Sequence, residues 1–142
     1  MKKQPTVITG TEGYGDAHSI GSRIITRALQ DAGFNVVLLG AGVQPDEFIE
    51  AAQETNADAI LMSSLYGMAE MDLIGFKEKC LEAGLGDVIF YIGGHLSVGR
   101  HDFKEDEKKF KDLGFDRVYP PEADIPSAID DLWSDLKAKG KA

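Results

Sequence analysis

The sequence contains a single cysteine, Cys80, among its 142 residues. An internal disulfide is therefore excluded, and so is a zinc site built from a cysteine cluster. Cys80 falls in a predicted helix, where a free cysteine usually acts as a small buried apolar side chain. No apolar run is long enough to span a bilayer, and the first residues lack the apolar stretch of a signal peptide. We therefore expect a cytoplasmic protein.

Basic residues are also scarce, with 15 against 24 acidic residues and a formal net charge of −9. Such a surface repels phosphate backbones and anionic lipids, so we expect neither nucleic acid nor membrane as a partner. The acidity fits both a salt-rich (halophilic) cytoplasm and an ordinary soluble protein. Hydrophobic residues make up 43% of the chain. This length and composition suit one domain over 1–142, with a core over about 5–137.

Short apolar runs alternate with amphipathic stretches along the chain. The predicted strands cover 6–9, 34–39, 59–62, 88–92 and 117–119. The predicted helices cover 20–32, a segment from 44 onward, 71–83, 105–113 and 125–137, and the tail 138–142 is expected to fray. Glycines that follow three of these helices are expected to cap them. Five strand–helix units in strict alternation predict a parallel sheet with helices on both faces.

This pattern predicts a three-layer α/β domain of the flavodoxin-like (Rossmann-like) class, with five parallel strands in the order 2-1-3-4-5. Ligands of such folds bind outside the carboxyl ends of the strands, at the switch point between strands one and three. Three predicted loops at these ends carry unusual residues, and they cover 10–21, 63–67 and 93–99. We expect the three loops to converge on one edge of the sheet and to form the site.

The first of these loops holds Asp16 and His18. In an extended segment residues two apart point to the same side, so the carboxylate can accept a hydrogen bond from one imidazole nitrogen. That bond orients the other nitrogen toward a metal. Cobalt in a corrin ring suits such a ligand, because the macrocycle supplies four nitrogens and the protein need supply only one. By spacing alone, however, the pair is more often a helix cap beside a surface histidine.

Gly21 extends this pair to Asp16-x-His18-x-x-Gly21. The pattern resembles the Asp-x-His-x-x-Gly signature of cobalamin-binding domains that displace the cofactor's own nucleotide base. Two further elements are similar to the Ser-x-Leu and Gly-Gly elements of that family, and they are Ser63-Ser64-Leu65 and Gly93-Gly94. Each motif is weak by itself, but the three occur in the family's order and fall where the predicted fold places the site.

Segments over 32–37, 63–67 and 114–121 resemble the small cobalamin-binding subunits of glutamate mutases (methylaspartate mutases), and the similarity spans about residues 5 to 135. The resemblance implies an adenosylcobalamin-dependent isomerase that interconverts L-glutamate and threo-3-methyl-L-aspartate by a radical carbon-skeleton rearrangement. It also implies a larger TIM-barrel catalytic subunit as partner, in a heterotetramer of two small and two large subunits.

The same resemblance assigns residues to the cofactor. It implies His18 as the axial ligand below cobalt, in place of the cofactor's dimethylbenzimidazole, and Asp16 as its hydrogen-bond partner. The displaced nucleotide tail would enter a cleft between strands one and three, where Ser63 donates a hydrogen bond and Leu65 packs near the corrin. The other residues expected around the cofactor are Gly15, Ala17, Ser19, Gly21, Ser64, Gly93, Gly94, His95, Leu96, Ser97, Val98, Gly99, Tyr119 and Pro120.

The paired glycines Gly93 and Gly94 would let the tail pass close to the backbone, since a Cβ there would intrude. The mutase subunits often carry Asn next, where this chain has His95. Histidine can donate a comparable hydrogen bond, so we expect His95 to line the tail pocket and not to bind cobalt. His101 has no motif support and is expected to be a solvated loop residue.

We identify no catalytic residue within this chain, and its Arg100 and Arg117 look isolated, with no arginine set to hold a dicarboxylate substrate. A corrinoid carrier for methyl transfer would use the same histidine motif. Such carriers bring a helical segment ahead of the corrin domain, whereas this chain starts almost at strand one. A non-enzymatic cobalamin-binding or sensor module and a response-regulator-like signalling domain are further alternatives, because fold alone does not establish function.

Overall fold

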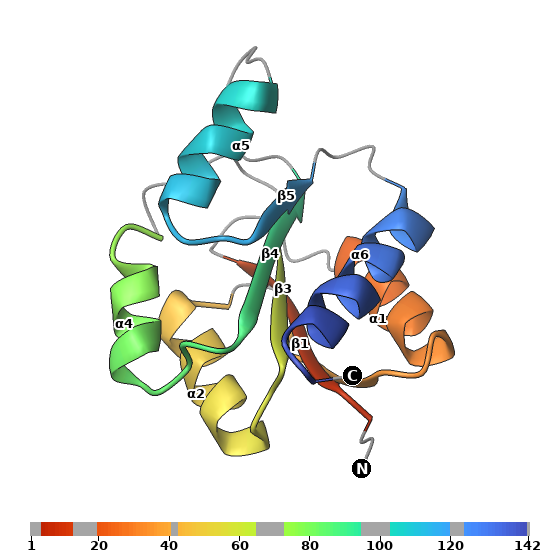
Figure 1. Cartoon of the computed structure of the whole chain (residues 1–142). Coiled ribbons are helices and arrows are strands. Elements are labelled where there is room, and N and C mark those ends of the chain that lie inside the picture. Colours follow the sequence, from red (N-terminus) through yellow and green to blue (C-terminus); the bar gives the residue numbers. More distant parts are fainter. Residues whose placement is uncertain are drawn as a thin grey trace.

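The computed structural model describes residues 4–12, 20–40, 43–64, 73–94, 103–119 and 124–141 of the chain. Strands and helices alternate along these residues (Figure 1). The strands are β1 (Thr6–Glu12), β2 (Asn35–Leu38), β3 (Ala59–Ser64), β4 (Ile89–Gly94) and β5 (Arg117–Tyr119). The helices are α1 (Ile20–Asp31), α2 (Pro45–Thr55), α4 (Phe76–Glu82), α5 (Phe103–Asp112) and α6 (Ile125–Ala138).

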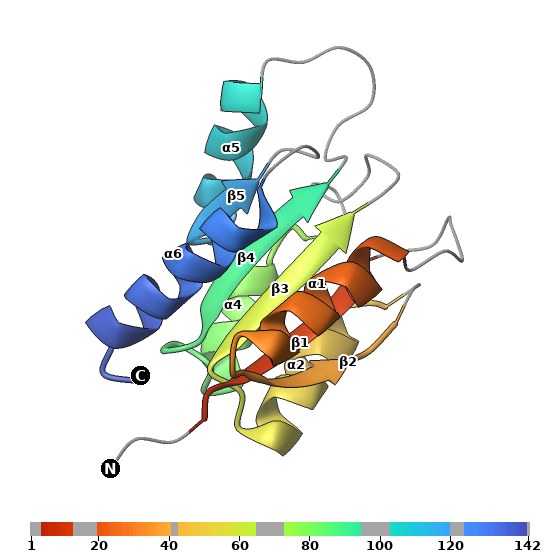
Figure 2. The same cartoon turned by 90° about the vertical axis from the view of Figure 1, so that its right-hand side faces the viewer.

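The strands form one sheet in the order β2-β1-β3-β4-β5, and every neighbouring pair is parallel. Figure 2 shows this order across the sheet, with the strands running toward the same edge. β1 and β3 are neighbours although α1, β2 and α2 lie between them in the sequence, so the switch point falls between these two strands. The predicted fold class and strand order are therefore confirmed.

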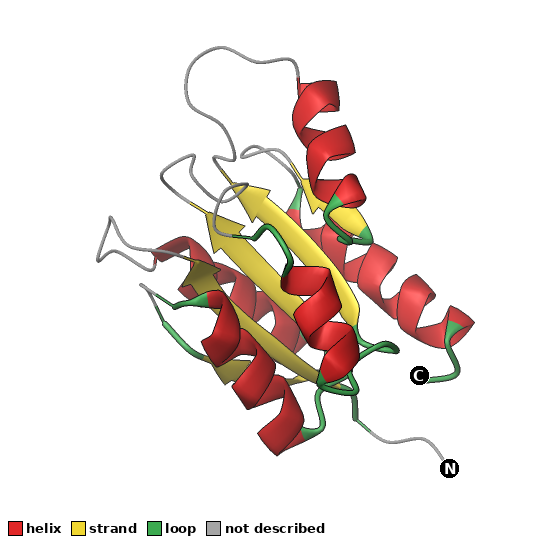
Figure 3. Ribbon diagram, turned by 90° about the vertical axis from the view of Figure 1, so that its left-hand side faces the viewer, coloured by secondary structure: helices red, strands yellow, loops and turns green. Residues whose placement is uncertain are grey.

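Successive residues of a strand point to opposite faces, and this alternation divides the core into two clusters. One cluster holds Ile8, Ile60 and Phe90 from the central strands and packs against α2, α4 and α5. The other holds Val7, Ala59 and Ile89 and packs against α1 and α6. Figures 1 and 3 show the two helix layers on opposite sides of the sheet. A parallel sheet needs such cover, because both of its faces are apolar.

The central strands are longer than their apolar runs predict. β1, β3 and β4 end at Glu12, Ser64 and Gly94. The first residues of the three predicted loops are therefore strand residues. Serine and glycine have little tendency to form strands, but β3 is paired on both sides to its last residue, and this pairing overrides local preference.

Two expectations about helix ends are wrong. The helix predicted over 71–83 is shorter, because residues 73–75 form a turn and Gly75 adopts a left-handed backbone (φ +80°) that cannot continue into α4. Residues 138–141, the described part of the C-terminal tail, also do not fray. Helix α6 runs to Ala138, the N–H of Lys141 donates to the carbonyl of Leu136 at 2.8 Å, and the Lys141 ammonium lies 3.6 Å from Asp58.

Two aspartates hold the amino-terminal edge of the sheet in the same way. Asp58 precedes β3; its N–H donates to the carbonyl of Thr6 at 2.8 Å, and its carboxylate accepts from the N–H of Thr6 at 2.9 Å. Asp116 precedes β5 and makes both contacts with Phe90, each at 2.8 Å. The Asp58 side chain is buried, so its loss would leave polar groups without a partner inside the protein.

Replacing Asp58 by alanine is expected to lower the free energy of unfolding by about 2 kcal/mol, because the N–H of Thr6 loses its acceptor and Lys141 loses its counter-ion. Urea unfolding at neutral pH measures the change. Asp31→Ala is the matched control, since the Asp31 side chain is 70% exposed and faces Arg27 across one helical turn. Equal and small changes in the two variants would contradict the expectation.

Candidate functional site

The side chains at the carboxyl ends of β3 and β4 are small. On the face covered by α1 and α6, Leu61 is followed by Ser63, and Tyr91 is followed by Gly93. The strand register places Thr11 beside Ser63 and Ser63 beside Gly93. Ser63 and Gly93 are half-buried, whereas Thr11 is buried. A ligand that reached this face would therefore meet the Ser63 hydroxyl and the Gly93 backbone at the switch point of the sheet.

Tyr119, the last residue of β5, continues this row of residues. It pairs with Gly93, and a Cβ at position 93 would lie 3.3 Å from the Tyr119 Cβ and 3.4 Å from its carbonyl oxygen. A larger residue at position 93 would therefore push against Tyr119. The Tyr119 hydroxyl donates to Asp131 Oδ2 on α6 at 2.7 Å. Tyr119 thus borders the row and is tied to α6.

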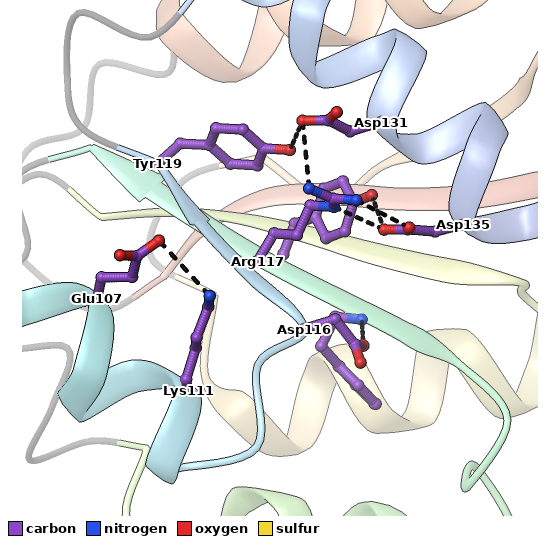
Figure 4. Close-up of polar contacts among 9 residues, drawn as sticks. Glu107, Lys111, Asp116, Arg117, Tyr119, Asp131 and Asp135 are labelled. Carbon is purple, nitrogen blue, oxygen red and sulfur yellow. Dashed lines mark hydrogen bonds and ion pairs between the residues drawn. The ribbon is translucent and has the colours of Figure 1, made fainter. Parts of the chain in front are cut away.

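Arg117 lies two residues before Tyr119 and joins β5 to α6 (Figure 4). Its Nε and Nη2 donate to the two carboxylate oxygens of Asp135 at 2.8 and 3.1 Å. Its Nη1 lies 3.7 Å from Asp131 Oδ2, the same oxygen that accepts from Tyr119. The Tyr91 hydroxyl also donates to Asp135. We call these five residues the β5–α6 network.

The sequence interpretation missed this network and described Arg117 as isolated. The carboxylates that hold Arg117 lie on the last helix, and sequence distance alone does not bring them to the strand. A signal was nevertheless present: Asp131 and Asp135 are four residues apart and share one helix face, while Arg117 and Tyr119 are two apart and share one strand face.

The network shifts the pKa values of its members. The hydrogen bonds from the Arg117 guanidinium hold the pKa of Asp135 below its ordinary value of 3.8. Burial raises the pKa values of Tyr91 and Tyr119, and their bonds to Asp135 and Asp131 raise them further. At neutral pH both phenols therefore stay protonated and donate, while Asp135 is ionised beside Arg117.

The structure describes part of the predicted site. Gly21 lies in the first turn of α1, Ser63 and Ser64 end β3, Gly93 and Gly94 end β4, and Tyr119 ends β5. Ser63, Gly93 and Tyr119 come together as one row, through the register given above. The other predicted residues lie outside the described ones: Gly15, Asp16, Ala17, His18, Ser19, Leu65, His95, Leu96, Ser97, Val98, Gly99 and Pro120, together with His101.

The described part of the chain contains no group of three histidine, cysteine or acidic side chains arranged to hold a metal ion. A site in which the protein supplies a single metal ligand would not need such a group. In the same described ranges, no helix is long and apolar enough to cross a membrane.

Comparison with known proteins defines the class to which this fold and site belong. The B12 binding domain family matches residues 6–119, so the chain belongs to that family. The glutamate mutase sigma subunit of Carboxydothermus hydrogenoformans is 51% identical over 134 residues, which cover 94% of this chain and 97% of that protein. The glutamate mutase sigma subunit 2 of Haloarcula marismortui is 53% identical over 131 residues, covering 92% and 87%. Within the family, this chain therefore groups with the glutamate mutase sigma subunits, which confirms the predicted resemblance.

Solved structures agree at the level of the fold. A cobalamin-binding protein from Desulfitobacterium hafniense superposes with a TM-score of 0.73 at 21% identity, over 94% of this chain and 60% of that one. Such low identity shows a shared fold only. The described strand ends fit a cofactor with a polar tail, because the half-buried Ser63 carries a hydroxyl group at the switch point and its neighbour Gly93 has no side chain.

The lowered pKa of Asp135 can be tested through the pH dependence of the free energy of unfolding. Because its folded pKa is lowered, the ionised carboxylate stabilises the fold above about pH 4, and this contribution disappears as the pH falls through the folded pKa. Asp135→Asn should therefore be less stable than the wild type at neutral pH, and the difference should shrink in acid. Urea unfolding between neutral pH and about pH 2.5 measures both proteins.

Asp130→Asn is the matched control, because Asp130 is an exposed residue of the same helix. Its unfolding free energy should follow the wild type across the range. A wild-type advantage over Asp135→Asn that stayed constant at every pH would contradict the assignment of the lowered pKa to Asp135.

Proposed function

We propose that this chain is the cofactor-binding subunit of an adenosylcobalamin-dependent glutamate mutase, which interconverts L-glutamate and threo-3-methyl-L-aspartate. The observation that carries the proposal is the 51% identity to a glutamate mutase sigma subunit over 94% of the chain. When bound, adenosylcobalamin supplies the radical that starts the rearrangement of the carbon skeleton. The chain's own residues bind and orient that cofactor.

His18 is the residue that would hold the cobalt of the cofactor, and Asp16 would hold its imidazole by a hydrogen bond. A neutral imidazole has one nitrogen that donates a proton and one that can bind a metal. The hydrogen bond to the Asp16 carboxylate fixes the donor nitrogen and leaves the other free for cobalt. Gly21 belongs to the same motif and falls at the start of α1, the helix that follows this segment.

The strand ends on the α1 and α6 side are the proposed pocket of the nucleotide tail. Ser63 donates to the tail, and Gly93 lets it approach the backbone. The register of Thr11, Ser63 and Gly93 supports this placement, because it joins two hydroxyl residues and a glycine in one row. The remaining members of the proposed pocket are Gly15, Ala17, Ser19, Ser64, Leu65, Gly94, His95, Leu96, Ser97, Val98, Gly99, Tyr119 and Pro120.

The substrate is held by a partner in this proposal. A dicarboxylate substrate calls for free arginine side chains. Among the arginine side chains that the structure describes, the guanidinium of Arg117 is bonded to Asp135 and that of Arg27 pairs with Asp31. The proposed partner is a larger TIM-barrel catalytic subunit, in an assembly of two small and two large subunits in the cytoplasm. The named relatives favour this function over a methyl-transfer carrier or a sensor module.

Reconstitution tests the proposal. The chain is mixed with the purified large subunit of a glutamate mutase, adenosylcobalamin and L-glutamate, and 3-methylaspartate is quantified by chromatography. The wild-type chain should support product formation, and His18→Ala should reduce the rate by roughly 100-fold, because the cofactor loses its ligand from the protein.

His101→Ala is the control histidine variant, and it should keep the wild-type rate. Corrinoid binding without any rearrangement would favour the sensor module. Turnover of a methylated cobalt species with a methyltransferase would favour the carrier. An unchanged rate in His18→Ala would contradict the role proposed for that residue.

A further inference from the structure

The β5–α6 network ties the edge strand to the last helix, in addition to the Asp116 contacts and the buried Val118 side chain. β5 has three residues and pairs with β4 alone among the described strands. Arg117 grips the Asp135 carboxylate with two parallel hydrogen bonds, a geometry that fixes orientation as well as distance. Asp135 is also the acceptor of the Tyr91 hydroxyl on β4. The Asp135 carboxylate of α6 therefore binds both β4 and β5 to the helix.

The second carboxylate, that of Asp131, extends the network to Tyr119 at the carboxyl end of the sheet. Asp131 Oδ2 accepts from the Tyr119 hydroxyl at 2.7 Å and lies 3.7 Å from Arg117 Nη1. The Tyr91 and Tyr119 rings also lie together, with their centroids 5.6 Å apart. Removing the Arg117 guanidinium would therefore take away the cation beside Asp131, the carboxylate that holds the Tyr119 hydroxyl (Figure 4).

Tyr119 in turn limits the proposed tail pocket. Its Cβ and carbonyl oxygen stand against Gly93, and Gly93 is the neighbour of Ser63. A change in the position of Tyr119 would therefore change the space available to a ligand beside Gly93 and Ser63. The Arg117 guanidinium is bonded to Asp135 on α6 and does not lie in the row of Ser63, Gly93 and Tyr119, because Arg117 comes two residues before Tyr119 on β5. The most direct connection from Arg117 to this row runs through Asp131 and the Tyr119 hydroxyl.

We infer that Arg117 is a positioning residue that fixes Tyr119 through Asp131 and so sets the shape of the pocket for the cofactor's nucleotide tail. The inference rests on the proposed function. It assigns to Arg117 and Asp131 a selective role: they act on the recognition of the tail and not on the recognition of the corrin ring. A corrinoid without the nucleotide tail should therefore be insensitive to both residues.

Equilibrium dialysis with two corrinoids tests the inference. The full chain is dialysed against cobalamin and, in parallel, against cobinamide, which carries the same corrin but lacks the nucleotide tail. Arg117→Met should weaken cobalamin binding by roughly tenfold and leave cobinamide binding unchanged. Arg117→Lys keeps the charge but not the two parallel hydrogen bonds, so its cobalamin affinity should fall between those of wild type and Arg117→Met.

Asp131→Asn supplies a second variant that carries the test if Arg117→Met does not fold. It keeps the size of the side chain and should show the same selective loss of cobalamin affinity. Arg27→Met is the matched control, since the Arg27 side chain is 79% exposed on α1. Its affinities should equal those of the wild type.

The outcomes separate the inference from the proposed function. A wild-type chain that binds neither corrinoid would refute the proposed function, and the inference with it. A wild-type chain that binds cobalamin, with folded variants that bind both corrinoids as the wild type does, would overturn the inference alone. Equal losses for cobalamin and cobinamide would also overturn it, because they would mark the network as a general support of the fold.

Discussion

The pairing of β1 with β3 is the constraint on which the site depends. These strands are separated in sequence by α1, β2 and α2, yet they lie side by side and run in parallel from Val7–Ala59 to Glu12–Ser64. Their carboxyl ends therefore meet at one edge, where the strand order reverses. Because the sheet is parallel, both faces need helices, and the residues free to meet a ligand are those at this edge.

The period and length of the apolar runs could predict the fold, because strands buried on both faces are almost continuously hydrophobic. They could not predict where the strands end. Ser63 and Gly93 are poor strand formers, and their strand conformation comes from pairing with neighbouring strands. For the site, motif spacing indicated candidate residues but not their contacts. The register that joins Ser63, Gly93 and Tyr119, and the carboxylates that hold Arg117, come from the tertiary structure.

β4 and β5 are held to α6 by polar contacts in addition to apolar packing. Tyr91 and Tyr119 place their rings in the cluster shared with α6 and extend their hydroxyls to Asp135 and Asp131. Arg117 balances these carboxylates in a chain with a net charge of −9. The edge strand β5 is thus held to α6 by charge attraction and by hydrogen-bond geometry. The Tyr91 hydroxyl links the same helix to β4.

The proposed ligation of cobalt by His18 is the central claim of this account. Electron paramagnetic resonance of cob(II)alamin with an excess of nitrogen-15-labelled protein measures it directly. Ligation by a labelled histidine splits the cobalt lines into doublets, and these should vanish in His18→Ala. The cofactor's own base, with natural nitrogen, gives triplets. Triplets that persist when binding is shown independently would mean that His18 does not displace the base, and would contradict the proposed role of the chain.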